Sequence, residues 1–264
     1  MIRVLVSGAC GKMGREVINA VSAAEDMTLV GAVDIANVGE DIGTIAFGKE
    51  NGLKIQGDLK SAILEIKPDV VVDFTQPNSA FNNAKTILES GARPVIGTTG
   101  LKENEIDELK KIAKKMNLSG MIAPNFTTGA VLMMMFAQMA AKYFDNAEII
   151  EYHHNQKKDA PSGTAVKTAQ LMAEVNPDLM KGNCAETETI PGSRGGTANG
   201  NIHIHSVRMP GYMASQEVLF GSTGQILSIR HDSVDRKCYM PGVLMGVRYV
   251  MDNEKFIYGL DNIL

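Results

Sequence analysis

The feature that most constrains the fold is a regular alternation of short apolar runs with helical patterns over the first 125 residues. The apolar runs predict strands over 2–6, 27–33, 70–75, 94–97 and 121–123. The stretches between them predict helices over 78–89, over 103–116 and from the first strand to about Ala24, with an irregular glycine-rich segment over 37–57. Strands that alternate with helices form βαβ units, in which the strands are parallel. We therefore expect an α/β domain whose parallel sheet is covered by helices on both faces.

Beyond Pro124 the pattern changes. A nearly all-apolar stretch over 128–143, capped by Thr128, predicts a helix that is buried on all sides. A strand over 147–152, a helix over 162–175 and a long loop over 181–200 are expected next. Three successive strands over 202–207, 216–220 and 225–230 follow, and then a helical stretch over 234–251 that is interrupted at Pro241-Gly242. The glycines at 221 and 224 mark a hairpin between the last two strands. Consecutive strands indicate a mixed or antiparallel sheet, so we expect a second, α+β domain.

Charge and apolar patterning exclude several classes of protein. Lys and Arg total 26 and Asp and Glu total 30, so the chain lacks the positive charge of a general nucleic-acid or anionic-membrane binder. The longest apolar stretch, 130–141, is interrupted by Gln138 and is shorter than the roughly 18 residues of a membrane span. The first residues lack the features of a signal peptide. A cytoplasmic protein with neither a membrane nor a nucleic-acid partner is expected.

Cysteine usage agrees with that location. The three cysteines, Cys10, Cys184 and Cys238, are odd in number and far apart, which is typical of reduced thiols rather than of a disulfide framework. The sequence holds neither a CxxC pair nor a His/Cys cluster with zinc-finger spacing. We therefore expect no metal site.

A glycine-rich loop follows the first expected strand and opens the first expected helix. Gly8, Gly11 and Gly14 have the spacing GxxGxxG, and glycine lets a backbone approach a pyrophosphate whose charge the helix N-terminus stabilises. Asp34, 20 residues after Gly14 and at the end of the second expected strand, can accept hydrogen bonds from an adenosine ribose. The alternative is a tight turn with an aspartate at that spacing by chance. The expected dinucleotide contacts in this loop are Gly8, Ala9, Cys10, Gly11, Lys12 and Met13.

The same region predicts which cofactor is preferred. The Asp34 carboxylate favours a ribose with a free 2′-hydroxyl and repels a 2′-phosphate, and the next residue is Ile35 rather than an arginine. Lys12 is the one cation of the loop that could offset this repulsion. We therefore expect NADH to be preferred and NADPH to be tolerated.

Two later loops are expected to reach the same ligand. Parallel sheets bind ligands at the carboxyl ends of their strands, where both loops begin. Taken alone, each is an ordinary turn, and only their shared place in the alternation favours a role in binding. The residues concerned are Gly97, Thr98 and Thr99 in the first loop, and Ala123, Pro124, Asn125 and Phe126 in the second.

The segment 151–164 is the most informative stretch of the second domain. Two histidines and two lysines precede a predicted helix N-terminus, which concentrates groups for anion binding and proton transfer. Ser162 can cap that helix, which leaves the N–H groups of Gly163 and Thr164 as a cradle for a carboxylate. One alternative is a solvated polar loop with an ordinary cap. Another is a zinc site, which is disfavoured because adjacent histidines point to opposite sides of an extended chain and Lys157 would repel a cation.

The remaining histidines and the methionine run are assigned structural roles. His203 and His205 alternate on one expected strand, so they share a face of the sheet and could touch the same site. His231 has no motif around it, and the run 133–135 is more typical of a core than of a cofactor site.

Together these motifs resemble the 4-hydroxy-tetrahydrodipicolinate reductase (dihydrodipicolinate reductase) family of lysine biosynthesis. The most specific match is Glu-x-His-His-x-x-Lys-x-Asp-Ala-Pro-Ser-Gly-Thr-Ala over 151–165, and the segments 8–14, 97–99, 123–125 and 206–217 also match. The resemblance thus covers nearly the whole chain. One departure is Ile35, where some members place an arginine for NADPH. Another is the segment 209–216, which differs from the acidic Gly-Asp loop of other members.

The resemblance implies a domain organisation and an activity. A Rossmann-type dinucleotide-binding domain would comprise residues 1–124 with 235–264, and a substrate-binding domain that forms a homotetramer would comprise 125–234. Closure about hinges near Pro124 and Val234 would bring cofactor and substrate together. The implied reaction is the NAD(P)H-dependent reduction of 4-hydroxy-tetrahydrodipicolinate, a cyclic dicarboxylate, to tetrahydrodipicolinate. The implied catalytic residues are His153, as proton donor, and Lys157, and the implied carboxylate ligands are Lys157, His154, Ser162, Gly163 and Thr164.

Two other functions are consistent with part of the sequence. Another small reductase, such as an amino-acid dehydrogenase, would share the glycine loop but would not need the histidine segment 151–164. A non-catalytic redox sensor would bind a dinucleotide without turnover and would leave that segment idle. Consumption of NADH with a defined substrate distinguishes the three.

Overall fold

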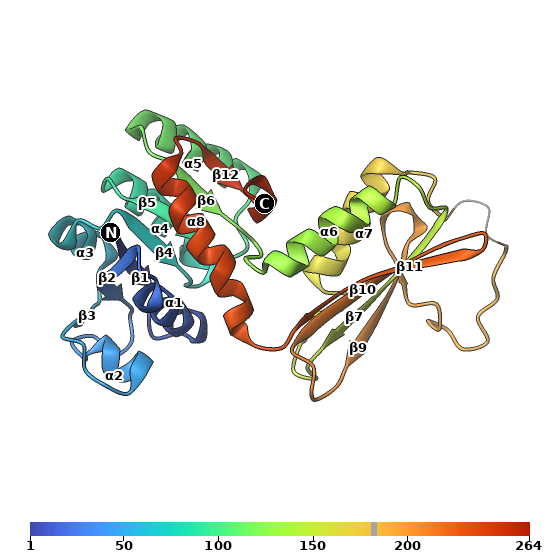
Figure 1. Cartoon of the computed structure of the whole chain (residues 1–264), viewed down its shortest axis with the longest axis horizontal. Coiled ribbons are helices and arrows are strands. Elements are labelled where there is room, and N and C mark those ends of the chain that lie inside the picture. The colour runs from blue at the N-terminus through green and yellow to red at the C-terminus, as the bar shows by residue number, and fades with distance from the viewer. Residues whose placement is uncertain (181–183) are drawn as a thin grey trace. The chain divides into compact units, whose positions relative to one another are not determined.

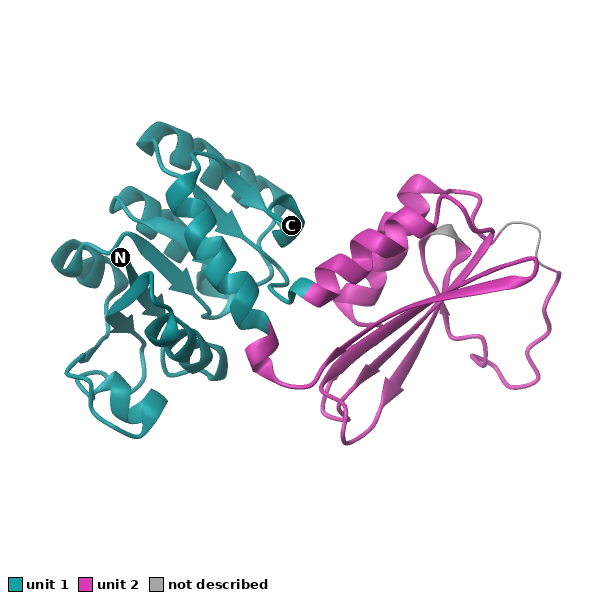
Figure 2. Cartoon of the chain, viewed as in Figure 1, with its two compact units in different colours: residues 1–128, 239–264 teal, residues 129–238 magenta. Residues whose placement is uncertain are grey.

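The computed structural model describes residues 1–180 and 184–264 and divides them into two compact units. Unit 1 comprises Met1–Thr128 and Tyr239–Leu264, and unit 2 comprises Gly129–Cys238 (Figure 2). Both boundaries lie slightly later in the chain than the expected ones after residues 124 and 234. Residues 181–183 of the predicted loop 181–200 lie outside the described residues.

The described residues of unit 1 form a seven-stranded, wholly parallel sheet in the order β12-β6-β5-β4-β1-β2-β3 (Figure 1). The strands are β1 (Ile2–Ser7), β2 (Met27–Val33), β3 (Ile55–Gln56), β4 (Val70–Asp73), β5 (Arg93–Ile96), β6 (Gly120–Ile122) and β12 (Phe256–Tyr258). Because both faces of the sheet are covered, its central strands are continuous apolar runs. The strand order reverses between β1 and β4, and ligands of such sheets bind outside the carboxyl ends at this reversal. The predicted α/β class is confirmed.

Helices cover both faces of this sheet. The helices α1 (Lys12–Ala23) and α8 (Met240–Asp252) lie on one face, and α3 (Leu59–Ile66), α4 (Pro77–Glu89) and α5 (Glu103–Met116) lie on the other (Figure 1). A short 3₁₀ turn, η2 (Arg236–Tyr239), precedes α8, and another, η3 (Leu260–Asn262), ends the sequence of elements. Pro241 therefore lies in the first turn of α8, where its missing N–H costs no hydrogen bond, rather than interrupting a longer helix.

The expectation of an irregular segment over 37–57 was wrong. The segment contains α2 (Ile42–Phe47) and β3. The Asp41 carboxylate holds it together by accepting backbone hydrogen bonds from Gly43, Thr44, Asn51 and Gly52. These bonds lower the pKa of Asp41 below its ordinary value. One buried side chain thus orders a segment that is too short to show helical periodicity.

Unit 2 contains a five-stranded mixed sheet among its described residues, in the order β11-β10-β7-β9-β8. The strands are β7 (Asn146–His153), β8 (Gly196–Thr197), β9 (His203–Arg208), β10 (Ala214–Ser222) and β11 (Gln225–Ser233), and a 3₁₀ turn, η1 (Asn199–Asn201), lies between β8 and β9. Within this sheet only β7 and β9 are parallel, and the other described pairs are antiparallel. The helices α6 (Thr128–Ala140) and α7 (Gly163–Val175) pack on one face. This face forms the apolar core of the unit.

Alternation along β7 decides which side chains face that core. Ala147, Ile149 and Glu151 are buried on the helix-covered face, and the intervening residues are only partly buried. The α6 helix is not buried on all sides as expected, because Phe136 is 50% exposed and Met139 is 60% exposed. Across the described part of the chain, every helix is too short or too polar to cross a lipid bilayer.

Candidate active site

The glycine loop lies at the carboxyl end of β1 and packs closely against the neighbouring backbone. Gly8 has a φ of +78°, and a Cβ there would lie 2.4 Å from the carbonyl oxygen of Phe74. A Cβ on Gly14 would lie 2.1 Å from the carbonyl oxygen of Gly8. Gly11 is the N-cap of α1, and because it has no side chain the first N–H groups of the helix can bind an anion.

Asp34 is joined directly to this loop. Its carboxylate accepts hydrogen bonds from the backbone N–H of Cys10 at 2.8 Å and from that of Ala36 at 3.0 Å. Each oxygen can accept a further bond, so two hydroxyl groups of a ribose could still be held. Ile35 is 95% exposed. The close backbone approach, the N-terminus of α1 and this carboxylate together fit a dinucleotide.

A buried carboxylate that the sequence analysis missed organises the next two strand ends. Asp73, which is fully buried, accepts hydrogen bonds from Thr75, Thr98 and Asn83 at 2.8–3.0 Å. The carboxyl ends of β4 and β5 are thereby held together, with Thr98 bonded to the end of β4. A signal was present in the sequence, because Asp73 interrupts an otherwise apolar run.

The second expected loop of the cofactor site is placed beside the first. The rings of Phe74 and Phe126 lie 6.0 Å apart, and a Cβ on Gly97 would overlap the Phe74 ring. Phe126 is 1% exposed and Ala123 is fully buried. Their side chains therefore belong to the core of unit 1, and only their backbone could contact a ligand.

Gly14 and Gly11 are expected to differ in their tolerance of a methyl group. Gly14→Ala should lower the affinity for NADH by about tenfold or more and destabilise the fold by about 1–3 kcal/mol, because its Cβ cannot be accommodated without moving the Gly8 backbone. Gly11→Ala should have a smaller effect, since its Cβ would lie 3.2 Å from the same oxygen. Calorimetric titration with NADH and thermal unfolding measure both. Wild-type affinity for NADH in both variants would show that the loop is not part of the cofactor site.

Unit 2 holds the histidine segment around a single buried carboxylate, Glu151. His153 Nδ1 lies 2.5 Å from Glu151 Oε2, and the N–H of Ser162 donates to Oε1 at 3.2 Å. Arg208 donates hydrogen bonds to both carboxylate oxygens of Glu151: Nη2 donates to Oε1 at 2.7 Å and Nη1 donates to Oε2 at 2.9 Å. Strand register explains why Arg208 lies close to Glu151 and His153, because the parallel pairing of β7 with β9 sets His153 opposite Arg208.

Electrostatics keep this carboxylate ionised. Burial alone would raise the pKa of Glu151, but hydrogen bonds from His153, Arg208 and Ser206 outweigh burial and hold the pKa at about 2. Glu151 is therefore negatively charged at neutral pH, and a carboxylate in that state can only accept hydrogen bonds.

The other expected substrate groups surround the start of α7. The Ser162 hydroxyl accepts a hydrogen bond from the N–H of Ala165 at 3.2 Å, so it caps α7 as expected. Gly163 is exposed, and Thr164 is partly exposed. The Lys157 ammonium pairs with both carboxylate oxygens of Asp159 at 2.8 and 2.9 Å. This bond lowers the pKa of Asp159 below its ordinary value.

His203 and His205 lie apart from this constellation. In the register of β7 and β9 they pair with Glu148 and Ile150, on the face opposite Glu151. His205 Nε2 lies 2.7 Å from Glu148 Oε2. They therefore do not share a face with His153.

His231, which has no motif, lies on the helix-covered face. It pairs with Gln216 of β10, which in turn pairs with Glu151 of β7. Burial lowers the pKa of His231 below its ordinary value. Its ring also lies where a side chain on Gly129 would be.

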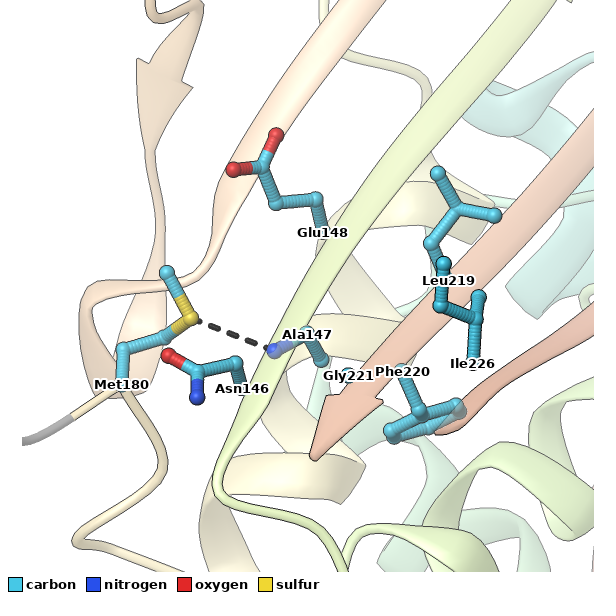
Figure 3. A pocket seen from close by; sticks show the side chains of 8 residues that line it. All are labelled: Asn146, Ala147, Glu148, Met180, Leu219, Phe220, Gly221 and Ile226. Atoms are coloured by element: carbon cyan, nitrogen blue, oxygen red, sulfur yellow. Dashed lines mark hydrogen bonds between the residues drawn. The ribbon is translucent and has the colours of Figure 1, made fainter. Parts of the chain in front are cut away.

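A pocket of about 260 Å³ opens at the other end of β7 (Figure 3). It is lined largely by apolar side chains around Ala147, whose N–H donates to the sulfur of Met180 at 3.2 Å. The charged side chain in its lining is Glu148, and the expected site residues are not among those that line it. Among residues 1–180 and 184–264, no group of three or more His, Cys, Asp or Glu side chains is placed to hold a metal.

Comparisons with known proteins agree with this arrangement. A sequence profile described as dihydrodipicolinate reductase, N-terminus, matches residues 2–126, and one described as dihydrodipicolinate reductase, C-terminus, matches residues 129–264. The chain belongs to the dihydrodipicolinate reductase family. The predicted family is thus confirmed, together with its place as an oxidoreductase of the reduction step in diaminopimelate and lysine biosynthesis.

Individual relatives cover the whole chain. It is 52% identical over 264 residues to the 4-hydroxy-tetrahydrodipicolinate reductase of Desulfitobacterium hafniense, covering 100% of this chain and 98% of the relative. It is 51% identical over 263 residues to that of Listeria innocua, with 100% of both chains covered. A solved structure described as dipicolinate-bound dihydrodipicolinate reductase from Paenisporosarcina sp. TG-14 superposes with a TM-score of 0.90 at 45% identity, with 100% of both chains covered.

Proposed function

We propose that the chain reduces 4-hydroxy-tetrahydrodipicolinate, with His153 as the proton donor and Lys157 as a second proton-transfer and charge-stabilising group. The observation that supports this most strongly is the contact of His153 with the ionised Glu151, beside the N-terminus of α7. When bound, NAD(P)H supplies the hydride. The substrate loses its 4-hydroxyl group as water, and the residues of unit 2 bind the dicarboxylate and deliver the proton that the reduced ring requires.

The carboxylates of the substrate have receptors of two kinds. The N–H groups of Gly163 and Thr164 begin α7, where the helix dipole favours negative charge. Lys157 and His154 supply side-chain donors, and Lys157 can exchange Asp159 for a substrate carboxylate. Ser162 holds the cradle in shape by capping the helix, so its role is indirect.

Binding of dipicolinate, a flat dicarboxylate, tests this assignment without turnover. We expect calorimetric titration to give saturable binding to the wild type and binding at least about tenfold weaker to Lys157→Met, because a charged hydrogen bond is lost. Lys158→Met, which removes the same charge from the next, exposed residue, should bind as the wild type does. Equal affinities for all three proteins would place the dicarboxylate elsewhere.

We further propose that NADH is preferred over NADPH. Asp34→Ala should reduce NADH affinity by roughly ten- to hundredfold while NADPH affinity holds or improves, since a ribose hydrogen bond and a repulsive charge both disappear. Because Asp34 also accepts from Cys10 and Ala36, Asp34→Asn is the matched variant that keeps the side-chain shape. Fluorescence titration with each cofactor measures the ratio. Equal losses for NADH and NADPH in both variants would show that Asp34 acts on the loop alone.

We also propose a cytoplasmic homotetramer that assembles through unit 2. The face of the sheet opposite α6 and α7 presents Ile150, Tyr152 and Leu219 on adjacent strands, and Ile226 on the edge strand is 81% exposed. Sedimentation equilibrium should give the mass of four chains, and Leu219→Glu should lower it. A monomeric wild type would contradict the proposal. The cysteines of the described residues are unbridged, which is consistent with a reducing compartment.

A further inference from the structure

The roles proposed above leave Glu151 and Arg208 without a function, although they form the most heavily bonded cluster of unit 2. Glu151 is completely buried and accepts from four residues, which lie on β7, on β9 and at the start of α7. These donors are His153 at the end of β7, Arg208 at the end of β9, Ser206 on β9, and the N–H of Ser162 at the start of α7. One charge thus connects the proposed proton donor with the proposed carboxylate cradle.

The ionised state of Glu151 determines how His153 is protonated. A carboxylate cannot donate a hydrogen bond, so the contact of 2.5 Å requires His153 Nδ1 to carry the hydrogen. The ring nitrogen left for exchange with a substrate is then Nε2. Neutral His153 is held as the Nδ1–H tautomer, and its protonated form carries the transferable proton on Nε2.

Arg208 is already saturated by the protein. Nη1 donates to Glu151 Oε2 and to the carbonyl oxygen of Val207, and Nη2 donates to Glu151 Oε1 and to the carbonyl oxygen of Asp159. These four bonds use all four terminal N–H groups. The remaining donor, Nε, is buried and is paired with no atom of the described residues. Arg208 therefore presents no exposed donor to a substrate carboxylate.

We propose that Glu151 and Arg208 are positioning residues of the reaction. Glu151 fixes the tautomer of His153. Arg208 holds Glu151 in place and also donates to the carbonyl oxygen of Asp159. It thereby positions the segment that carries Lys157 relative to Glu151. The proposal rests on the proposed role of His153 as the proton donor. It assigns the two residues different effects, on kcat for Glu151 and on KM for Arg208.

Glu151→Gln makes a specific prediction about the tautomer. The amide has one oxygen and one NH₂ group, whereas both carboxylate oxygens of Glu151 face donors. At Oε1 both partners, Arg208 Nη2 and the N–H of Ser162, can only donate. At Oε2 one partner, Arg208 Nη1, can only donate, but the other, His153, can accept if its hydrogen moves to Nε2. The NH₂ group is therefore expected on the His153 side, where it reverses the tautomer.

Nitrogen NMR of protein labelled with ¹⁵N-histidine shows directly which ring nitrogen of His153 carries the hydrogen. The chain has five histidines, so His153 can be assigned by comparison with the spectrum of His153→Gln. We expect the Nδ1–H tautomer in the wild type and the Nε2–H tautomer in Glu151→Gln. The kcat of Glu151→Gln should fall by at least about tenfold, with a smaller change in KM.

Glu148→Gln is the matched control. Glu148 lies on the same strand, on the opposite face of the sheet, and contacts Arg194 at 2.6 Å and His205 at 2.7 Å. This substitution should leave the tautomer of His153 and kcat unchanged. A fall in kcat as large as that of Glu151→Gln would show a general effect of removing a carboxylate from the sheet and would overturn the proposal.

Arg208→Lys keeps the proposal testable if Glu151→Gln does not fold. A lysine preserves the charge beside Glu151 but cannot span both oxygens and the Asp159 carbonyl. We expect the Nδ1–H tautomer to persist, kcat to change less than threefold, and KM for the substrate to rise by about tenfold. An unchanged KM, or a lost tautomer, would contradict the division of roles.

The outcomes separate this inference from the function on which it rests. If His153→Gln abolishes turnover but Glu151→Gln retains both the Nδ1–H tautomer and wild-type kcat, only the positioning role is wrong. If His153→Gln turns over normally, the proposed function itself fails. The NMR measurement requires no turnover, so it remains informative in either case.

Discussion

His153→Gln is expected to lower kcat by about 10²–10⁴-fold and to leave KM comparatively unchanged. Glutamine has a similar size and retains hydrogen bonding, but its amide cannot take up and release a proton at neutral pH. Because Glu151 holds the imidazole at 2.5 Å, the substitution removes the proton and leaves the surrounding donors in place. Steady-state kinetics at saturating NADH measures both constants.

His154→Gln is the control for this prediction. His154 is the adjacent residue, is exposed, and accepts a hydrogen bond at Nδ1 from the N–H of Gln156 at 3.2 Å. As a proposed carboxylate ligand it should raise KM and largely preserve kcat. If His153→Gln instead raises KM with normal kcat, His153 is a binding group and the proton comes from Lys157 or from water.

Lys157→Met should lower kcat and raise KM for the substrate. The ammonium attracts a carboxylate in the ground state and also stabilises charge in the transition state, so a loss of roughly ten- to hundredfold in affinity accompanies a lower kcat. The affinity for NADH should not change, because the dinucleotide residues belong to unit 1. Kinetics and NADH titration on the same preparation check the three expectations.

Two variants help to interpret Lys157→Met. Asp159→Asn keeps the lysine but removes the charge of its partner, which accepts from Lys157 at 2.8 Å. It should lower KM, since the ammonium is no longer held by a competing carboxylate. Lys158→Met should behave as the wild type does. A Lys157→Met enzyme with normal KM would mean that Lys157 does not contact the substrate.

The parts of the fold that could be predicted from sequence are those specified by local pattern. The continuous apolar strands of unit 1 and the capped start of α7 at Ser162 follow from periodicity and cap chemistry. By the same logic α3 could have been predicted, because Asp58 caps it and Leu59, Ala62 and Ile66 recur at helical spacing. The strand β12 has three residues, which is too short for a pattern.

The parts that could not be predicted depend on register between distant strands. Arg208 meets Glu151 only because β7 and β9 pair in parallel with one particular alignment, and neither local spacing nor composition encodes that alignment. The same holds for Gln216 and His231, which the antiparallel pairs of β10 bring to the row of Glu151. The histidine motif, Glu151 included, was visible in the sequence, but the pairing of Glu151 with Arg208 was not.

The most direct test of catalysis by this chain is the oxidation of NADH with freshly condensed pyruvate and aspartate semialdehyde, followed by absorbance. The wild type is expected to consume NADH only when both precursors and the condensing activity are present, and His153→Gln is expected to consume it at least about a hundredfold more slowly. The contradictory result is an intact wild type that binds NADH in calorimetry yet consumes none under these conditions. That outcome would favour a sensor that binds the dinucleotide without turnover.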